Sequence, residues 1–231
     1  MLLAPIVEIF HSVQGEGKFC GAPSFFVRTS GCNLRCWFCD TPYTSWAAEG
    51  TDLSIEEVLS RVGEWDTRHV VITGGEPMLL AELVPLTTDL AAQGRHITIE
   101  TAGTLDLPVT CDLMSISPKL GNSTPPREKH PRWSARHDRT RHAPDVIRRL
   151  SRDYNYQLKF VVDRPEDCRE VEQYLREFPE IDRDRVLLMP QGTDTAALDE
   201  RASWLIPYCR ESGMRYCPRK QIEWYGMLRG T

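Results

Sequence analysis

The sequence lacks the features that mark membrane, secreted and nucleic-acid-binding proteins. Its 231 residues contain no uninterrupted apolar run of roughly 18 residues or more, and no positively charged leader precedes an apolar stretch. Neither a membrane span nor a secretory signal is therefore predicted, and we expect a cytoplasmic location. The formal net charge of -5 argues against a general nucleic-acid binder, whose phosphate contacts would need a basic surface.

No internal repeat is found, and the composition does not favour disorder. With 41% hydrophobic and 26% charged residues, the chain has the make-up of a soluble globular protein. Its length and composition predict a single domain over residues 1–231 with enough apolar surface for a sizeable core.

Short β-rich runs alternate with helical patterns from Pro23 onward, which indicates repeated βα units around a parallel sheet. Periodicity alone does not separate an open doubly wound sheet from an incomplete barrel, so both stay open at this point. The pair Ser54 and Glu57 forms a capping-box pattern that predicts the start of a helix. Buried strands are predicted at residues 24–29, 70–73, 97–100, 113–117, 158–162 and 186–189, and further helices at 79–93 and 166–178.

One segment breaks this alternation. Residues 121–143 contain three prolines and no hydrophobic period, which predicts a long loop or insertion. Between residues 127 and 152, nine lysines and arginines stand against three carboxylates. This local excess fits a solvated surface loop, a docking patch for an acidic electron donor, or a cover over an anionic ligand.

Three of the eight cysteines crowd into one short segment, where Cys32, Cys36 and Cys39 form a CxxxCxxC array just after a predicted strand. Structural zinc normally needs four ligands, and no second CxxC or HxxxH pair stands at a usual distance. Three cysteines can hold a 4Fe–4S cluster with one iron left open, which is useful only if something else binds that iron. The spacing therefore predicts an iron–sulfur site with room for a substrate or cofactor ligand, and the other five cysteines are expected to be structural thiols.

The cysteine array resembles that of the radical S-adenosylmethionine superfamily, and the segment from Thr73 to Pro77 (TGGEP) is similar to the superfamily's GGE/P segment. The resemblance implies that S-adenosylmethionine chelates the open iron and that the reduced cluster passes one electron into its sulfonium to start radical chemistry. It also implies an α/β fold, an incomplete (βα)6-type partial TIM barrel with the cluster at the carboxyl ends of the strands.

Further segments resemble the 7-carboxy-7-deazaguanine synthase family of queuosine and 7-deazapurine biosynthesis. In chain order these segments are FxSxQGEG from Phe10, FVR ending at Arg28, the cysteine array with Asp40 and Thr41 after it, TGGEP, ETAGT from Glu100, and SPK from Ser117. The resemblance implies a carbon–nitrogen lyase that converts 6-carboxy-5,6,7,8-tetrahydropterin to 7-carboxy-7-deazaguanine with loss of ammonia.

The same resemblance implies a role for each matching position, and it assigns no side chain as an acid or base. Substrate contacts are implied for Val13, Gln14, Gly15, Glu16, Arg28 and Thr73, with Arg28 gripping the substrate carboxylate. Contacts to S-adenosylmethionine are implied for Phe38, Asp40, Gly75, Ser117, Pro118, Lys119, Met189, Pro190, Gln191 and Gly192. Implied metal ligands are Cys32, Cys36 and Cys39 for the 4Fe–4S cluster and Thr41 for Mg²⁺. Glu100 is left open as either a site carboxylate or an ordinary strand-end residue.

The resemblance further implies a homodimer and a flavodoxin-like or ferredoxin-like electron donor. The tail departs from the pattern, because Gln221 stands where many relatives carry the histidine of a Pro-x-x-His stretch. This departure leaves open what the tail contributes to the substrate pocket, and whether the pathway is that of queuosine or of another deazapurine.

Two other interpretations stay open from the sequence. A glycyl-radical activating enzyme would need a peptide groove, and the QGEG turn with Arg28 favours a pterin pocket instead. A non-enzymatic binding module could use the three cysteines to hold a structural metal, but the single CxxC pair counts against it.

Overall fold

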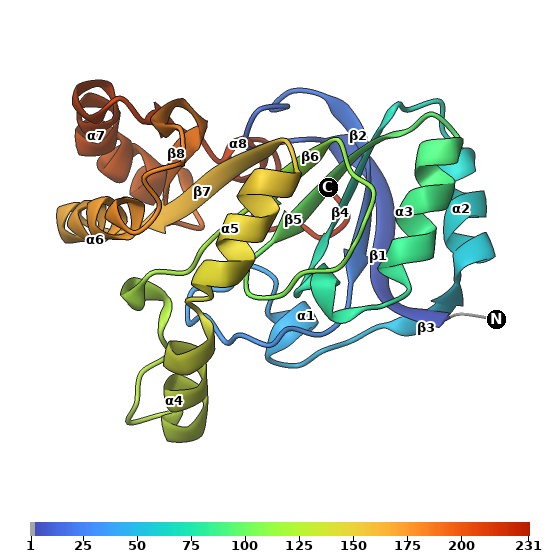
Figure 1. Cartoon of the computed structure of the whole chain (residues 1–231), viewed down its shortest axis with the longest axis horizontal. Helices are drawn as coiled ribbons and strands as arrows, with labels where there is room; N and C mark the ends of the chain where they lie inside the picture. Colours follow the sequence, from blue (N-terminus) through green and yellow to red (C-terminus); the bar gives the residue numbers. More distant parts are fainter. Residues whose placement is uncertain (1–2) are drawn as a thin grey trace.

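The computed structural model describes residues 3–231, whose strands form one nine-stranded sheet (Figure 1). The strand order is β3-β1-β2-β4-β5-β6-β7-β8-β9. The strands are β1 (Leu3–Val13), β2 (Pro23–Thr29), β3 (Thr51–Ser54), β4 (His69–Gly74), β5 (His96–Thr101), β6 (Leu113–Ile116), β7 (Tyr156–Val162), β8 (Val186–Pro190) and β9 (Arg215–Tyr216).

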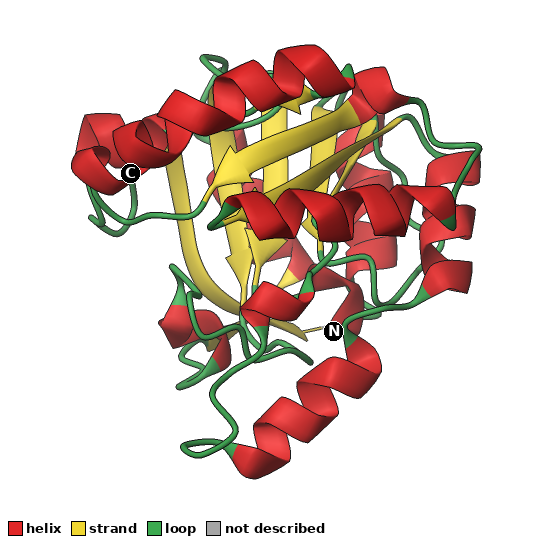
Figure 2. Cartoon of the chain, turned by 90° about the vertical axis from the view of Figure 1, so that its left-hand side faces the viewer, coloured by secondary structure: helices red, strands yellow, loops and turns green. Residues whose placement is uncertain are grey.

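Most of the helices lie along the outside of this curved sheet (Figures 1 and 2). The α-helices are α1 (Pro42–Ser45), α2 (Ile55–Gly63), α3 (Leu83–Ala92), α4 (Pro131–Thr140), α5 (Pro144–Asp153), α6 (Pro165–Arg176), α7 (Thr195–Ser212) and α8 (Lys220–Tyr225). Three short 3-10 helices are η1 (Pro77–Leu79), η2 (Gly121–Ser123) and η3 (Arg183–Arg185). No helix within residues 3–231 is long and apolar enough to cross a membrane.

The sheet topology separates the two folds that periodicity left open. Neighbouring strands from β2 to β9 pair in parallel and follow the order of the chain, while β1 pairs antiparallel with both β2 and β3. A doubly wound sheet reverses its strand order at a switch point, whereas a (βα) barrel does not. The predicted partial barrel is therefore confirmed.

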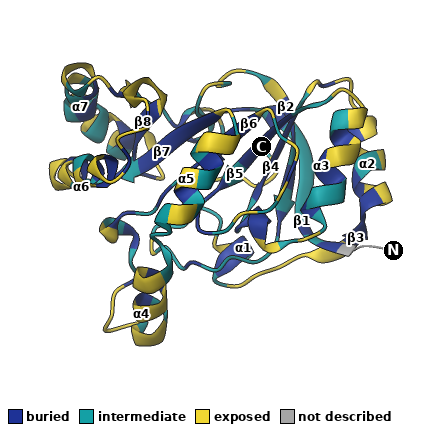
Figure 3. Cartoon of the chain, in the orientation of Figure 1, coloured by how far each residue is buried: buried dark blue, intermediate teal, exposed yellow. Residues whose placement is uncertain are grey.

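All six predicted buried strands are present, as β2, β4, β5, β6, β7 and β8. They form the buried centre of the molecule (Figure 3), because their valines, isoleucines and leucines pack against the inner faces of the helices. The predicted capping box is also present at the start of α2. The Glu57 backbone N–H donates to Ser54 Oγ at 3.2 Å, and the Ser54 N–H donates to a Glu57 carboxylate oxygen at 2.7 Å.

Two helix predictions need correction. The segment 121–143, predicted as a loop, contains α4, which stands away from the sheet at one end (Figure 1). Pro131 suits the first helical position, and α4 buries only Ser134 and His137, so it has no apolar stripe to reveal it in the sequence. The helix predicted over 79–93 begins only at Leu83, because Glu76 accepts the Met78 N–H and starts the separate turn η1.

Candidate active site

A cavity of about 310 Å³ lies on the inner side of the sheet and is closed on one side by the end of the chain. Sixteen of the residues assigned from the resemblance line it; Pro118, Pro190, Gln191 and Gly192 do not. The lining residues among those predicted are Val13, Gln14, Gly15, Glu16, Arg28, Cys32, Cys36, Phe38, Cys39, Asp40, Thr41, Thr73, Gly75, Ser117, Lys119 and Met189. Segments far apart in the sequence thus meet around one space.

Cys32, Cys36 and Cys39 lie in the loop that follows β2, and all three are free thiols that line the cavity. The Leu34 N–H points at Cys32 Sγ at 3.4 Å, and Cys39 Sγ lies 3.4 Å from Ser45 Oγ. Burial raises the pKa of the Cys32 thiol to about 11 and that of the Cys36 thiol to about 12. Bare thiolates are therefore costly here, and a cationic partner that binds thiolates would relieve that cost.

The donor set fits a cluster better than a single ion. Within residues 3–231, no three His, Cys, Asp or Glu side chains converge closely enough to hold one metal ion. An iron–sulfur cluster instead takes one thiolate at each of several irons, and thiolates are its usual ligands. Three thiols line this cavity, and its described lining residues include no fourth; this donor set fits a 4Fe–4S cluster that keeps one iron for another ligand.

The glycines of TGGEP bring the loop after β4 against the cysteine loop. A Cβ on Gly75 would lie 1.9 Å from the Gly31 carbonyl oxygen, so only glycine fits there. Glu76 is fully buried, and its carboxylate accepts hydrogen bonds from Thr101 Oγ1 and from the Ala102 N–H, each at 2.8 Å. The motif therefore locks the cysteine loop and the ends of β4 and β5 together.

Arg28 lies on β2 with its side chain in the cavity wall. Its Nε donates to Glu8 Oε1 at 2.6 Å, and the Tyr43 hydroxyl donates to the same oxygen at 3.0 Å. Glu8 thus fixes the guanidinium through Nε, which leaves the two terminal amino groups for a ligand. A planar fork held in this way suits a carboxylate.

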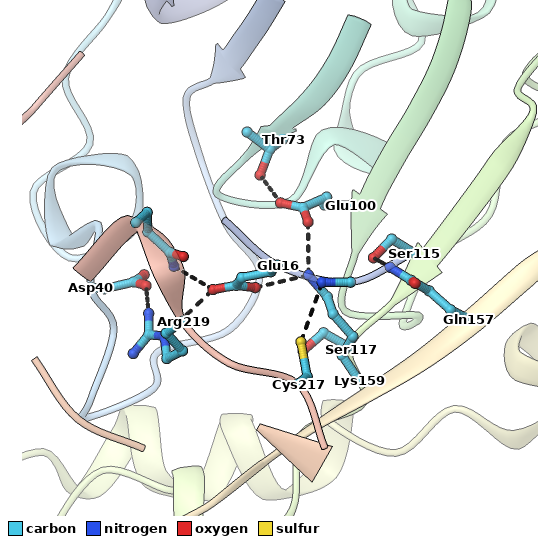
Figure 4. Close-up of polar contacts among 12 residues, drawn as sticks. Glu16, Asp40, Thr73, Glu100, Ser115, Ser117, Gln157, Lys159, Cys217 and Arg219 are labelled. Carbon is cyan, nitrogen blue, oxygen red and sulfur yellow. Dashed lines mark hydrogen bonds and ion pairs between the residues drawn. The ribbon is translucent and has the colours of Figure 1, made fainter. Parts of the chain in front are cut away.

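A chain of charged groups, with Lys159 buried at its centre, crosses the cavity (Figure 4). Lys159, on β7, donates from Nζ to Glu16 Oε2 at 3.0 Å and to Glu100 Oε1 at 2.8 Å. Glu100 Oε2 in turn accepts from Thr73 Oγ1 at 3.0 Å. The position of Glu100 in this chain favours a site carboxylate over an ordinary strand-end residue.

Arg219 continues the chain on its other side. This buried side chain pairs with both Glu16 and Asp40, and its Nη1 donates to the Gly192 carbonyl oxygen at 2.7 Å. Gln221 Nε2 also donates to Glu16. The C-terminal segment therefore ties together the turn after β1, the loop after the cysteines and the loop after β8.

Several of these residues were not predicted from the sequence. Lys159, Arg219 and Glu8 all make contacts that hold predicted site residues in place. One signal for Lys159 was present, since a lysine between Leu158 and Phe160 in a buried strand needs a partner for its charge.

The basic segment divides into two parts. Arg141, Arg148, Arg149 and Arg152 pair with carboxylates on neighbouring elements or within their own helix. Within residues 3–231, no such ion pair is made by the remaining five basic residues, Arg127, Lys129, Arg132, Arg136 and Arg139, which are all exposed. These five, on α4 and the turn before it, are called the basic face below.

Helix α4, which carries three of the five residues of the basic face, contacts the cysteine loop. The Arg35 N–H donates to His137 Nδ1 at 3.1 Å, and the Trp37 N–H donates to the Ser123 carbonyl at 3.1 Å. Arg35 also lies over the ring of Trp133. Helix α4 therefore supports the backbone between the first two cysteines.

Comparison with known proteins agrees with this site. Residues 26–123, which include the three cysteines and TGGEP, match the model of the radical SAM superfamily. A 7-carboxy-7-deazaguanine synthase of Rhodopirellula baltica is 47% identical over 227 residues, covering 98% of this chain and 88% of that protein. One from Halobacterium salinarum is 46% identical and covers 94% of this chain and 89% of its own length.

A solved structure of the same kind shares the fold. The crystal structure of QueE from Escherichia coli aligns with a TM-score of 0.72 at 27% identity, covering 94% of each chain. These similarities favour neither a glycyl-radical activating enzyme nor a non-enzymatic binding module. The chain belongs to the 7-carboxy-7-deazaguanine synthase family of the radical S-adenosylmethionine superfamily.

Proposed function

We propose that this enzyme converts 6-carboxy-5,6,7,8-tetrahydropterin to 7-carboxy-7-deazaguanine with loss of ammonia, a step of queuosine or other 7-deazapurine biosynthesis. One observation carries the proposal most: Arg28, Gln14, Glu16 and the cysteine loop all line one cavity. Family membership supports it, since relatives matched over nearly the whole chain bear the name of this activity.

The cofactor site is proposed at the cysteine loop. With Cys32, Cys36 and Cys39 as ligands, a 4Fe–4S cluster and S-adenosylmethionine supply the one-electron chemistry that starts the reaction. Phe38, Asp40, Gly75, Ser117, Lys119 and Met189 are proposed to contact S-adenosylmethionine, since they line the same cavity. The same contact is proposed for four residues that do not line the cavity, Pro118, Pro190, Gln191 and Gly192.

Lys119 and Ser117 fix each other's side chains at the proposed S-adenosylmethionine site. Its Nζ donates to the Ser117 carbonyl at 2.6 Å and to Ser117 Oγ at 2.8 Å, so the two side chains form one unit at the end of β6. Its positive charge suits the carboxylate of S-adenosylmethionine.

The substrate is proposed to lie between the turn after β1 and the end of β4. Arg28 holds the substrate carboxylate, while Val13, Gln14, Gly15, Glu16 and Thr73 surround the ring. Gln14 is preorganised for this, because its Nε2 donates to Ser24 Oγ at 2.7 Å within the protein and so fixes the direction of its free oxygen.

Mg²⁺ is proposed to bind at Thr41. The hydroxyl of this residue lines the cavity, 3.4 Å from Thr44 Oγ1. One protein oxygen suffices if water and the substrate complete the octahedral shell that Mg²⁺ prefers. Asp40 is not free to join as a full ligand, because Arg219 holds it.

The electron donor is proposed to be an acidic flavodoxin-like or ferredoxin-like protein that docks on the basic face. Helix α4 contacts the cysteine loop, and Trp37 within that loop is 50% exposed. Opposite charges would bring the two redox centres together. We also propose a homodimer, a single domain over residues 1–231, and a cytoplasmic location, where the cluster thiols stay reduced.

Anaerobic reconstitution tests the proposed function. The reduced enzyme, given S-adenosylmethionine, Mg²⁺ and 6-carboxy-5,6,7,8-tetrahydropterin, should form the deazaguanine chromophore, and Cys36→Ala should abolish both the 4Fe–4S absorbance and turnover. Cys209→Ala is a matched control, since that buried thiol lies on α7 outside the cavity. A Cys36→Ala enzyme that keeps turning over would refute the cluster assignment.

A further inference from the structure

We infer that Lys159 is a positioning residue for substrate recognition. It holds the carboxylates of Glu16 and Glu100 together as paired hydrogen-bond acceptors for the N–H groups of the substrate ring. The inference rests on the proposed function, since it concerns how that substrate is recognised.

Lys159 lines the cavity between the two carboxylates, and its ammonium group donates to both of them. Its side chain is 4% exposed, and its Nζ bridges Glu16 from the turn after β1 and Glu100 from the end of β5 (Figure 4). An ammonium group has three donors, and these two carboxylates take two of them. Lys159 therefore holds the two carboxylates together in the cavity wall, where both Glu16 and Glu100 can accept hydrogen bonds from a ligand.

The two carboxylates differ in how much acceptor capacity they keep. Glu16 receives Lys159, Arg219 and Gln221, and its side chain is 17% exposed. Glu100 receives only Lys159 and Thr73, and its side chain is 33% exposed. Because an ionised carboxylate accepts about four hydrogen bonds, Glu100 has most of the free capacity that faces the cavity.

This capacity depends on charge state. An ionised carboxylate only accepts hydrogen bonds, whereas a protonated one also donates and would oppose a ring edge rich in N–H groups. Two carboxylates held near each other in a partly buried site, without a cation between them, favour sharing a proton. Lys159 removes that tendency by neutralising the repulsion between Glu16 and Glu100.

The direction of the pKa shifts agrees with this geometry. Burial alone would raise the pKa of Glu16, but Lys159 and Arg219 lower it to about 2. Burial alone would lower the pKa of Lys159, but Glu100 and Glu16 raise it above its ordinary value. The remaining titratable neighbours are Asp40, which Arg219 pairs, and Cys217, whose pKa burial raises to about 12 so that it stays a neutral thiol.

The test measures binding of 6-carboxy-5,6,7,8-tetrahydropterin by anaerobic calorimetry, on cluster-loaded enzyme with S-adenosylmethionine, from about pH 6 to about pH 9. Lys159→Met removes the charge with little change of shape, and Lys159→Arg keeps the charge. Lys220→Met is the matched control, since its ammonium pairs with Glu223 at the surface. Cluster absorbance and melting temperature report whether each variant folds.

Lys159→Met should bind the pterin about 10- to 100-fold more weakly than the wild type near pH 6. Its affinity should recover as the pH rises, because loss of the shared proton leaves both carboxylates as hydrogen-bond acceptors. Wild type and Lys220→Met should show no such recovery, and Lys159→Arg should stay within a few-fold of wild type.

A second variant guards against misfolding. The double change Lys159→Met with Glu100→Gln leaves Glu16 paired with Arg219, so weak binding should persist while its pH dependence disappears. Binding by Lys159→Met equal to wild type, or weakened by one factor at every pH, would overturn the inference. Failure of the wild type itself to bind the pterin would instead overturn the proposed function, and the two failures are therefore distinguishable.

Discussion

Arg28 owes its orientation to Glu8, the residue opposite it in the antiparallel pairing of β1 and β2. The carboxylate also receives the Tyr43 hydroxyl, and all three side chains stand at the cavity wall or just behind it. In this arrangement the Arg28 Nε donates to the protein, and the two terminal amino groups of the guanidinium stay available for a ligand. Glu8 is thus a positioning residue for the proposed substrate contact.

Replacing either member of this pair should affect substrate binding more than the cluster. Arg28→Ala should raise KM about 100-fold, because a buried charge-assisted pair with the substrate carboxylate is lost. Glu8→Gln should raise KM by less, about 5- to 10-fold, because the amide still accepts one hydrogen bond but without charge. Steady-state kinetics and iron content measure the two effects separately. An unchanged KM in Arg28→Ala would refute carboxylate recognition at this position.

For single residues, the sequence predicts those that lie in motifs better than those that form long-range ion pairs. The residues that line the cavity could be assigned from their place in QGEG, CxxxCxxC and TGGEP, and those motifs do come together. Lys159 and Arg219 lie outside such motifs, and their partner Glu16 is far away in the chain. Only folding brings these charges within hydrogen-bonding distance, so no local sequence pattern predicts their ion pairs.

Among the elements, α4 connects the basic face to the cysteine loop through one buried histidine. His137 Nδ1 accepts the Arg35 N–H, which leaves its other nitrogen to donate to Ser123 Oγ at 2.9 Å. Burial lowers the pKa of His137 to about 4, so the folded protein holds it neutral. A protonated ring would turn Nδ1 into a donor that faces another donor.

Acid should therefore loosen this element. In the unfolded chain the pKa of histidine is near its ordinary 6.5, so the stability that depends on neutral His137 is present above that pH. This stability is lost progressively as the pH falls from about 6.5 toward about 4, because His137 then binds a proton in the unfolded chain but not in the folded protein.

Melting temperatures of the apoprotein between pH 7 and about pH 4.5 measure this loss. His137→Asn keeps an acceptor beside Arg35 but does not titrate in this range. Its melting temperature should be lower at neutral pH by about 2–8 °C and should then fall less steeply than that of the wild type. Parallel curves for the two proteins would contradict this role of His137.

Elements with a strong apolar pattern could be predicted, and those without one could not. Runs of β-branched residues predict the buried strands, and a capping box predicts the start of α2. Helix α4 buries a serine and a histidine, so its sequence resembles that of a solvated loop. The edge strands β3 and β9 are short and draw their stability from pairing with β1 and β8.

For the whole molecule, the parallel strands and the C-terminal segment line one cavity, and a cationic surface lies on α4, the helix that contacts the cysteine loop. The chain carries a net charge of -5, yet the five residues of the basic face are exposed without a carboxylate partner in the described part of the chain. A local cation cluster on an acidic protein gives an acidic donor one preferred approach.

Charge reversal on this face should impair the protein donor alone. Changing Arg132, Arg136 and Arg139 to Glu should raise the KM for flavodoxin about 10-fold or more, with the largest effect at low salt. Turnover driven by dithionite should stay at the wild-type level, because a small reductant needs no docking. Equal kinetics with flavodoxin before and after the reversal would place the docking surface elsewhere.

The fold class could be predicted as a whole, whereas closure of the site could not. Alternating β and α patterns indicated the parallel sheet, but they could not show that the tail returns to the cavity, where Gln221 contacts the turn after β1. This return depends on the close fit of Gln221 against Gly15, where a Cβ would lie 2.2 Å from the amide oxygen. Such steric matching between the two ends of a chain has no sequence signature.

The measurement that tests the central claim most directly counts three products in one anaerobic reaction of the wild-type enzyme with 6-carboxy-5,6,7,8-tetrahydropterin. If the enzyme is a ring-contracting lyase, it should release one ammonia for each 7-carboxy-7-deazaguanine. Because we propose that it also regenerates S-adenosylmethionine, it should release far less 5'-deoxyadenosine than either product. Accumulation of 5'-deoxyadenosine without deazaguanine or ammonia would contradict the assignment of this cavity as a pterin site.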